Sequence, residues 1–352
     1  MASAPNPPTA SDLAQSDAIG TGGQASDGLR HSSPPAEWIQ LIKDCRDAFD
    51  HVAHMRPVQS QLCESEQVIL NRFREQHGLK SFTGCTLDEI LEADKSRDSA
   101  AHSLEKLKVA DLRKRVADLK LPDNTDDHIR AYLDSDFNLL RMLRARNLDL
   151  DKAFRLLEGA IAWRGNARPH EMKCASCVST IERCLKSPKL LYSDECCSDM
   201  RFIGYDPAHR PVLYCSFRHT KHRGVQQTIE HTCAALERAV AVMHKGSPGD
   251  VIVVNNFNGF SFSDLNPLVG VRAIQVFSDF YPETLKMMIV VDPPRIFWPL
   301  FHRILKPLLA KETAAKALFL DSRTADGGRA VLAEHFFDDM TDWLVHRIKN
   351  DH

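Results

Sequence analysis

Six side chains between residues 170 and 197 are the best candidates for metal chemistry: His170, Cys174, Cys177, Cys184, Cys196 and Cys197. Cys174 and Cys177 have the spacing of a zinc-ligand pair. A structural zinc site needs a second compact pair, however, and adjacent Cys196 and Cys197 can hardly both reach one ion. The pattern favours unliganded thiols, so we predict no metal. Zinc is the less favoured alternative, which elemental analysis of the purified protein tests.

The segment HTCAALER (231–238) contains a second candidate nucleophile, Cys233. A cysteine phosphatase needs a tight loop whose backbone N–H groups surround the thiolate, followed by an arginine. Arg238 lies one position too close, no glycine intervenes, and the segment has a helical pattern. The glycine-rich stretch GTGGQASDG (20–28) follows no strand, so it cannot cradle a phosphate as a dinucleotide-binding turn does. We therefore predict no catalytic residue, no cofactor and no enzyme activity.

Charge and hydropathy exclude further classes of function. The 352 residues carry a net charge of -2 and a pI near 6.8, so no global attraction to nucleic acid exists. The start MASAPNPPTASD lacks the basic and apolar regions of a secretory signal. Apolar runs such as MMIVV (287–291) are far shorter than the ~18 residues of a membrane span. We expect a cytoplasmic protein with reduced cysteines.

The N-terminal third divides by composition. Residues 1–35 are rich in Ala, Ser, Pro and Gly and are expected to be disordered. Residues 36–125 form a predicted helical extension. One of its helices has apolar residues at amphipathic spacing: Leu104, Leu107, Val109, Leu112, Val116 and Leu119. Its charged face is expected to be solvated, and binding of a protein partner is the alternative.

Residues 126–195 are predicted to form a second helical domain. The segment 135–164 gives two helices joined at RNLD, with Ser135 and Asp149 as candidate N-caps. Arg141, Arg144 and Arg146 lie near the end of the first helix, where cations complement the helix dipole.

Residues 196–352 alternate between strand and helix signals. MRFIGYD and RPVLYCSF predict a hairpin, and VIVVNNF, LKMMIVVD and ALFLD predict buried strands. The helix QTIEHTCAALERAVAVMHK precedes VIVVNNF, and another runs from an Asp/Ser cap in FSDLNPLV to near Pro282. The order predicts an α/β fold with a mixed sheet and helical crossovers.

The crossover between the last two strands is unusually apolar. Nine of the fourteen residues from Ile296 to Leu309 are large and apolar, whereas a surface helix needs only a stripe about 100° wide. A cationic tail with small residues follows it. Such a helix needs a large apolar surface to cover.

Five segments together resemble the CRAL-TRIO lipid-binding family, founded on the yeast phosphatidylinositol transfer protein: LLRMLRARNLDLDKAFRLLEGAIAWR, GYDPAHRPVLY, NFNGFSF, YPETLKMMIVVDPPRIF and LKPLLAKETAAKALFL. The resemblance covers about residues 130–320. It departs at the C-terminus, where DGGRAVLAEHFFDDMTDWLVHRIKN predicts a helix in place of the family's Leu-Pro and Gly-Gly segment. What covers that edge of the pocket is left open.

The resemblance implies that residues 295–309 form a movable gate helix over a lipid-sized hydrophobic pocket. The implied gate residues are Ile296, Phe297, Trp298, Leu300, Phe301, Ile304 and Leu305. At ~0.8 kcal/mol per CH₂, two fatty chains represent on the order of 25 kcal/mol in water. Lipid exchange is therefore expected only while the gate touches a membrane, which implies a transient peripheral association.

The resemblance also implies a headgroup site for phosphatidylinositol. The matching positions are Glu283, Thr313, Lys316 and Arg146. Two neighbouring cations of the family are replaced, by Asn147 and Thr284. Glu283 and Lys316 would equally suit a plain salt bridge.

The implied pocket residues are Phe202, Leu213, Val251, Val253, Phe277 and Tyr281. The family's choline-lipid site has hydroxyl-bearing side chains where four of these are apolar, so we expect phosphatidylinositol and not phosphatidylcholine. A sterol or another hydrophobic ligand is an alternative cargo. The other class of function is a lipid-sensing regulatory protein or scaffold that acts through residues 36–125.

Overall fold

The computed structural model describes residues 86–122, 125–172, 200–219, 224–243, 247–260, 266–309 and 311–350. The predicted tail 1–35, most of the extension and the cysteine-rich segment 173–199 lie outside these ranges. Among the described residues, no group of three or more His, Cys, Asp or Glu could hold a metal ion. No helix in the same ranges is long and apolar enough to cross a membrane.

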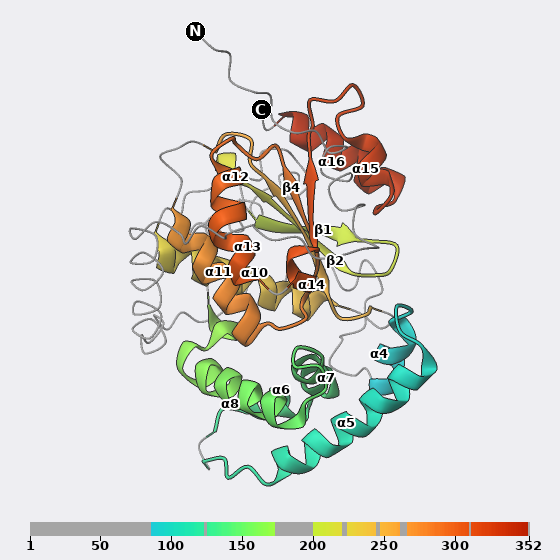
Figure 1. Cartoon of the computed structure of the whole chain (residues 1–352), viewed down its shortest axis with the longest axis vertical. Helices are drawn as coiled ribbons and strands as arrows, with labels where there is room; N and C mark the ends of the chain where they lie inside the picture. The colour runs from blue at the N-terminus through green and yellow to red at the C-terminus, as the bar shows by residue number, and fades with distance from the viewer. Residues whose placement is uncertain are drawn as a thin grey trace, which may run out of the picture.

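Five strands form one sheet in the order β1-β2-β3-β4-β5: β1 (Met200–Tyr205), β2 (Pro211–Ser216), β3 (Val251–Asn256), β4 (Leu285–Val291) and β5 (Ala317–Leu320). β1 and β2 pair as an antiparallel hairpin, and the other neighbours pair in parallel. Helix α10 (Val225–Val242) leads from β2 to β3, and α11 (Pro267–Phe280) leads from β3 to β4 (Figure 1). The predicted mixed α/β fold with helical crossovers is confirmed.

The hydroxyl and carboxylate caps expected from the sequence are only partly used. Asp149 caps its helix as predicted, because its carboxylate accepts the backbone N–H of Lys152 at 3.0 Å. Ser135 occupies an N-cap position, but its side chain makes no cap hydrogen bond. The expected Asp/Ser cap of α11 is wrong: the helix begins at Pro267, and the Asn266 side chain accepts from the backbone N–H of Leu268.

The N-terminal helices form a separate layer beneath the sheet in Figure 1. They are α4 (Leu87–Ala93), α5 (Ser99–Ala117), α6 (Asp127–Asp134), α7 (Asp136–Arg144), α8 (Leu150–Ala167) and a 3₁₀ turn, Pro169–Glu171. The predicted helix pair at 135–164 corresponds to α7 and α8. We call this layer the N-terminal lobe.

The buried face of α5 differs from the sequence-based stripe. Leu104 and Leu107 are 46% and 58% exposed, although Val109 and Leu112 are buried as expected. The fully buried residue in the first half of the helix is Glu105. Its carboxylate binds the guanidinium of Arg144 at 2.8 Å, and this neutralisation lets the helix turn a charged side chain inward.

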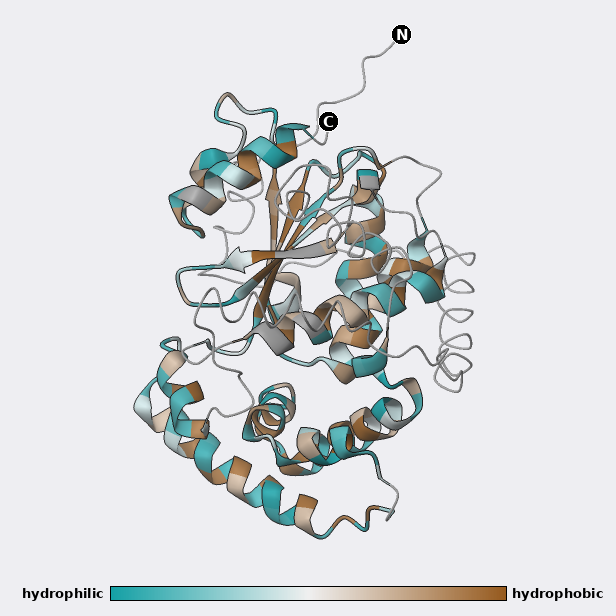
Figure 2. Cartoon of the chain, turned by 180° about the vertical axis from the view of Figure 1, so that it is seen from behind, coloured by the Kyte–Doolittle hydropathy of each residue, from teal (hydrophilic) through white to brown (hydrophobic). Residues whose placement is uncertain are grey.

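The two faces of the sheet have different covers. Residues in register across strands share a face, so Leu213, Val253, Met288 and Ala317 form one row. The opposite face is covered by α15 (Arg329–Ala333) and α16 (Asp338–Asn350). The C-terminal helix therefore covers the back of the sheet and not an edge of the expected pocket. The strands themselves are predominantly apolar (Figure 2).

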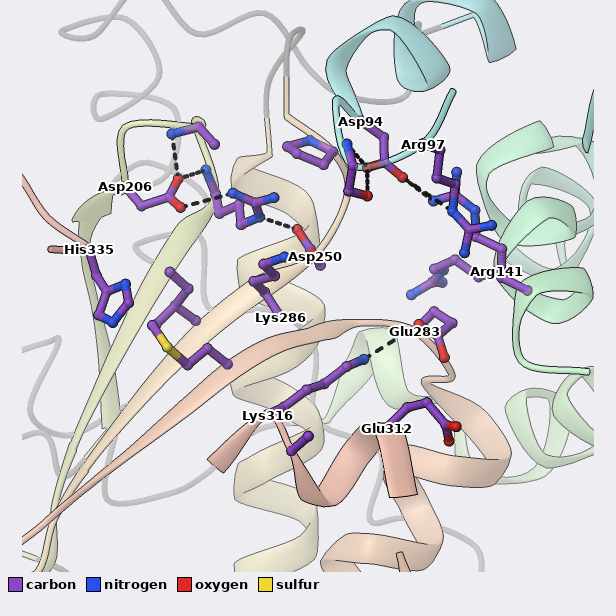
Figure 3. Close-up of a pocket in the computed structure, with 18 of the residues that line it drawn as sticks. Asp94, Arg97, Arg141, Asp206, Asp250, Glu283, Lys286, Glu312, Lys316 and His335 are labelled. Atoms are coloured by element: carbon purple, nitrogen blue, oxygen red, sulfur yellow. Dashed lines mark hydrogen bonds and ion pairs between the residues drawn. The ribbon is translucent and has the colours of Figure 1, made fainter. Parts of the chain in front are cut away.

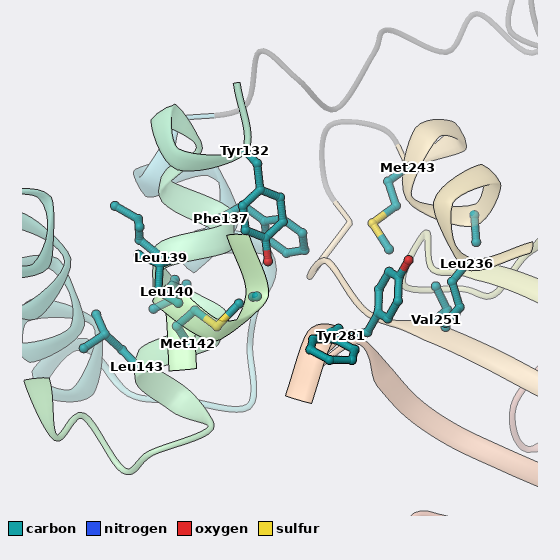
Figure 4. Packing of buried hydrophobic residues seen from close by; sticks show 14 of the residues in the cluster. Tyr132, Phe137, Leu139, Leu140, Met142, Leu143, Leu236, Met243, Val251 and Tyr281 are labelled. Carbon is teal, nitrogen blue, oxygen red and sulfur yellow. The ribbon is translucent and has the colours of Figure 1, made fainter. Parts of the chain in front are cut away.

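The N-terminal lobe shares an apolar core with α10, α11 and the adjoining strand residues. Figure 4 shows apolar side chains of α7 opposite Leu236, Met243, Val251 and Tyr281 of the sheet layer. The rings of Trp163 and Phe280 stack with centroids 4.2 Å apart.

Buried charges join the same two layers. Arg164 donates to the carboxylate of Glu237 at 2.8 Å, and the Tyr281 hydroxyl donates to the same oxygen at 2.7 Å. Burial favours the neutral form of Glu237, but Arg164 outweighs it and holds the pKa of Glu237 below its usual value. The lobe and the sheet are therefore joined by both apolar and ionic contacts.

Candidate lipid-binding site

The predicted gate is a helical crossover from β4 to β5. It consists of α12 (Phe297–Leu300), a π-helical turn (Phe301–Leu305) and α13 (Lys306–Leu308), and α14 (Lys311–Ala314) follows it. In the π turn the backbone N–H of Lys306 bonds to the carbonyl of Phe301, five residues earlier. Pro307 has no N–H for the carbonyl of Arg303, so regular α-helical bonding cannot continue there.

The gate lays its apolar side chains on the sheet. Phe297, Leu300, Phe301, Ile304 and Leu305 are buried, Trp298 is half-buried and Ile296 is exposed. The five buried residues pack with Met288, Val290, Phe319 and Val271 in one cluster. Phe319 of β5 is the centre of its aromatic contacts, with the Trp298 ring at 4.7 Å and the Phe301 ring at 5.3 Å.

A glycine lets the gate approach α11 closely. A Cβ at Gly270 would lie 2.9 Å from Cδ2 of Leu305, which is too close for an undisturbed contact. Leu305 therefore fills the space that any larger residue at position 270 would need. In this structure the predicted gate packs on protein.

The predicted pocket residues lie together on the gate side of the sheet. Leu213, Val251, Val253 and Tyr281 are buried in one cluster, and half-buried Phe277 packs against it. The backbone of Phe202 pairs with Leu213, and its side chain lies outside what the structure describes. Val253 is in register with Met288 under the gate. Protein atoms contact these side chains in this structure.

A cavity of about 720 Å³ opens where β3, β4 and β5 begin. It lies between these strand ends and helices α4 and α7 of the N-terminal lobe (Figure 3). Glu283 and Lys316, two of the predicted headgroup residues, line it. Thr313 and Arg146 are not among the lining residues.

Glu283 and Lys316 come from different elements that meet at the cavity. Glu283 lies in the turn between α11 and β4 with a φ of 52°, and Lys316 directly precedes β5. Lys316 Nζ and Glu283 Oε2 are 3.4 Å apart, and the side chains are 23% and 40% exposed. The pair is partly solvated, so both groups can exchange this contact for a ligand.

The other two predicted headgroup residues are placed differently. The carbonyl of Thr313 accepts the backbone N–H of Lys316 at 3.1 Å, and its neighbour Glu312 lines the cavity although Thr313 does not. Arg146 donates to the carbonyl of Ala145 and acts electrostatically on Asp279, near the end of α11. Burial raises the pKa of Asp279, and Arg146 only partly offsets this effect.

Arg141 is a cavity residue that we did not predict. Its guanidinium donates to the Thr284 hydroxyl at 2.5 Å and to the Asn138 side chain at 2.6 Å, and it lies over the Phe137 ring at 4.4 Å. The side chain is only 3% exposed, and burial lowers its pKa. Neither hydrogen-bond partner carries a negative charge. In the sequence, the sign that this arginine would be buried was its position inside the apolar run LLRML.

Most other charges around the cavity are paired. Arg144 lies in the last turn of α7, as expected, and also binds Asp94 at 2.9 Å as well as Glu105. Arg210 binds Asp250 at 2.5 Å. Burial raises the pKa of Asp250 despite this partner. These pairs fix the walls of the cavity and leave Arg141 as a buried cation without a carboxylate partner among the described residues.

Comparison with protein-family models identifies the fold. Residues 200–339 match the model of the CRAL/TRIO domain. The chain contains a CRAL-TRIO domain. Domains of this family bind and transfer lipophilic ligands, and the resemblance stated from the sequence is confirmed.

Curated relatives of the CRAL-TRIO domain are distant. A CRAL-TRIO domain-containing protein of Caenorhabditis elegans is 27% identical over 204 residues, which cover 54% of this chain and 27% of that protein. The alpha-tocopherol transfer protein-like protein of Homo sapiens is 28% identical over 211 residues, which cover 55% of this chain and 54% of that protein. The matches thus span between about a quarter and about half of these relatives. Among solved structures, the crystal structure of Sfh5 matches with a TM-score of 0.44 at 16% identity, covering 62% of this chain and 80% of that one.

The CRAL-TRIO domain buries the cysteine that we weighed as a nucleophile. Cys233 lies inside α10 and is fully buried. Burial raises the pKa of its thiol to about 12. A nucleophilic cysteine needs the opposite shift.

Proposed function

We propose that this protein binds phosphatidylinositol and exchanges it at membranes through the gate helix. The observation that carries the proposal is the meeting of Glu283, Lys316 and buried Arg141 at one cavity. The gate leads through α14 to Lys316 and β5, so Lys316 follows the apolar cover closely in the chain.

The three groups suit the chemistry of this headgroup. A phosphodiester needs cationic donors, which Lys316 and Arg141 supply. Inositol hydroxyls need acceptors, and the carboxylate of Glu283 is one. A phosphate against Arg141 would also provide the negative charge that its buried guanidinium lacks. Thr313 would add a hydroxyl after a small rotation of the turn before β5.

The fatty chains would replace the gate on the sheet. Lifting the gate uncovers Met288, which lies in one row with Leu213 and Val253, and Val290, two residues further along β4. Acyl chains are apolar, so they cover the same surface without a loss of hydrophobic stabilisation. The gate is then free to contact a bilayer.

Phosphatidylcholine fits this site poorly. The side chains of Leu213, Val251 and Val253 are buried and apolar, so they offer its phosphate no hydrogen bond. The remaining hydroxyl, on Tyr281, is already bonded to Glu237. We therefore expect phosphatidylinositol to be preferred.

Mass spectrometry of lipids that copurify with the recombinant protein tests the cargo. Phosphatidylinositol as the main species is expected, and phosphatidylcholine as the main species would refute the proposal. Transfer between donor and acceptor vesicles then separates a carrier from a sensor. A sensor would hold phosphatidylinositol without transferring it.

A neutral lipophilic cargo is the second candidate. It is favoured by the similarity to proteins named as alpha-tocopherol transfer protein-like and by the apolar row across the sheet. The same mass spectra decide the matter, because a neutral lipophile in place of phospholipid would select this candidate.

A further inference from the structure

Two histidines are stacked where the N-terminal lobe meets the sheet layer. His128 belongs to α6, and His170 belongs to the 3₁₀ turn after α8. The two rings are stacked with their centroids 3.7 Å apart. Helix α10 of the sheet layer packs against this turn. The stack therefore lies at the contact that joins the lobe to the CRAL-TRIO domain.

The neighbours of His128 require its ring to be neutral. Nε2 of His128 is 3.2 Å from Nη1 of Arg164. A guanidinium can only donate hydrogen bonds, so Nε2 is the acceptor and carries no proton. The other terminal nitrogen of Arg164 donates to Glu237 of α10, so a single arginine connects the stack to the sheet layer. A proton on Nε2 would replace this hydrogen bond with the repulsion of two cations.

The carboxylates near the stack already have other partners. The charged groups that act on the two rings are Asp126, Arg164, Arg168, Glu171 and Glu237. Arg164 binds Glu237 at 2.8 Å, and Arg168 binds Asp126 at 2.9 Å and also the carboxylate of Glu171. Nε2 of His170 is 3.7 Å from Oε1 of Glu171, beyond hydrogen-bond distance. Each of the three carboxylates thus bonds an arginine, and none is free to bond a protonated ring.

The environment lowers the pKa of both rings. Burial and then the neighbouring His170 ring bring the pKa of His128 to about 4, and the carboxylates offset this only in part. Burial also lowers the pKa of His170, whose Nδ1 is buried without a hydrogen-bond partner among the described residues. In the unfolded chain a histidine titrates near a pH of about 6.5. His128 therefore stabilises the joint fully above about pH 6.5, and this contribution is lost as the pH falls from there toward about 4.

The stack lies on the helix that leads into the wall of the headgroup cavity. Helix α6 ends at Asp134, and α7 begins two residues later at Asp136. Helix α7 supplies Arg141 to the cavity wall, where its guanidinium donates to Thr284 at the start of β4. Movement of the lobe away from α10 would therefore also move Arg141 away from Thr284.

We propose that the His128–His170 stack is an acid-sensitive latch between the N-terminal lobe and α10. A proton taken up from solvent by the stack breaks the hydrogen bond between His128 and Arg164 and loosens the lobe. Arg141 then moves out of the headgroup cavity, so bound phosphatidylinositol is released. The loosening is a property of the chain itself, whereas the release of lipid rests on the proposed function.

Hydrogen–deuterium exchange of the full chain tests the loosening at about pH 7.5 and about pH 5, with rates corrected for the intrinsic effect of pH. Peptides of α8, the 3₁₀ turn and α10 report on the joint. In the variant His128→Gln, the amide oxygen can still accept from Arg164 but takes up no proton at these pH values. On acidification, the opening constant of the joint should rise about 10- to 30-fold more in the wild type than in this variant. The control His346→Gln removes an exposed histidine of α16 and should behave like the wild type.

An equal rise in His128→Gln, or no rise in the wild type, would overturn the latch. Circular dichroism at about pH 7.5 checks that each variant is folded, and His170→Gln repeats the comparison from the other ring if His128→Gln is not.

Retention of labelled phosphatidylinositol at the same two pH values tests the release. The wild type should lose lipid near pH 5, and His128→Gln should retain more of it. Full retention by a wild type whose joint has loosened would overturn the release step. A wild type that binds no phosphatidylinositol at about pH 7.5 would refute the proposed function instead, and the exchange data would still decide whether the latch exists.

Discussion

The Glu283–Lys316 pair is either a structural salt bridge or part of a headgroup site, and Lys316→Ala distinguishes the two. The groups are 3.4 Å apart and 40% and 23% exposed. Ion pairs that solvent reaches contribute about 0–1 kcal/mol. The substitution should therefore lower the free energy of unfolding by at most about 1 kcal/mol.

Lipid binding should respond far more strongly to the same change. A hydrogen bond from a charged donor to phosphate contributes about 1.5–3 kcal/mol, which corresponds to roughly 10- to 150-fold in affinity. Lys286→Ala is the matched control, because Lys286 lines the same cavity and forms no ion pair with a described residue. It removes the same charge without disturbing Glu283, and a loss below about threefold is expected.

Urea unfolding and competitive loading with labelled phosphatidylinositol measure the two effects side by side. A loss of about 2 kcal/mol or more in unfolding free energy, with lipid loading no weaker than in Lys286→Ala, would refute the reasoning. The pair would then be structural.

Three other changes address the joint between the layers and the gate. Glu237→Ala leaves the buried guanidinium of Arg164 without its carboxylate, so urea unfolding should show a loss of about 3–5 kcal/mol; a loss below about 1 kcal/mol would contradict the ionic joint. The pKa of Glu237 is lowered in the folded protein. Its contribution to the free energy of unfolding is therefore fully present above the ordinary pKa of Glu and is lost as the pH falls through the lowered pKa. The wild type should therefore lose more stability between pH 6 and pH 3 than Glu237→Gln, and parallel pH profiles would count against this. Gly270→Val forces Leu305 away, so the packing of the gate on α11 should weaken by about 1–3 kcal/mol and lipid transfer between vesicles should accelerate. Slower lipid transfer would show that this packing does not limit the rate of transfer.

The strands and the helical crossovers could be predicted because each strand is a short apolar run bounded by turn residues. VIVVNN at β3 is an example, since burial on both sides makes the run continuous. The unusual apolarity of residues 296–309 likewise predicted a helix that covers a large surface. These features depend on local sequence and reappear in the structure.

Features set by distant partners could not be predicted. Nothing near Leu104 shows that Glu105 will be buried instead, because the reason is Arg144 on another helix. Arg141 was read as a complement to the helix dipole, whereas its environment is made by Thr284, 143 residues away. The π turn is a third case, since its wider bonding is visible only in the backbone.

The gate is anchored at both ends to neighbouring parallel strands, since β4 leads into it and β5 follows it. Both of its ends therefore stay with the sheet when it moves. An outward movement of the middle of the gate, at the π turn, would displace Lys316 near one end. The ion pair between Lys316 and Glu283 would then weaken. The headgroup and the acyl chains of the lipid would then be released together, and neither would leave before the other.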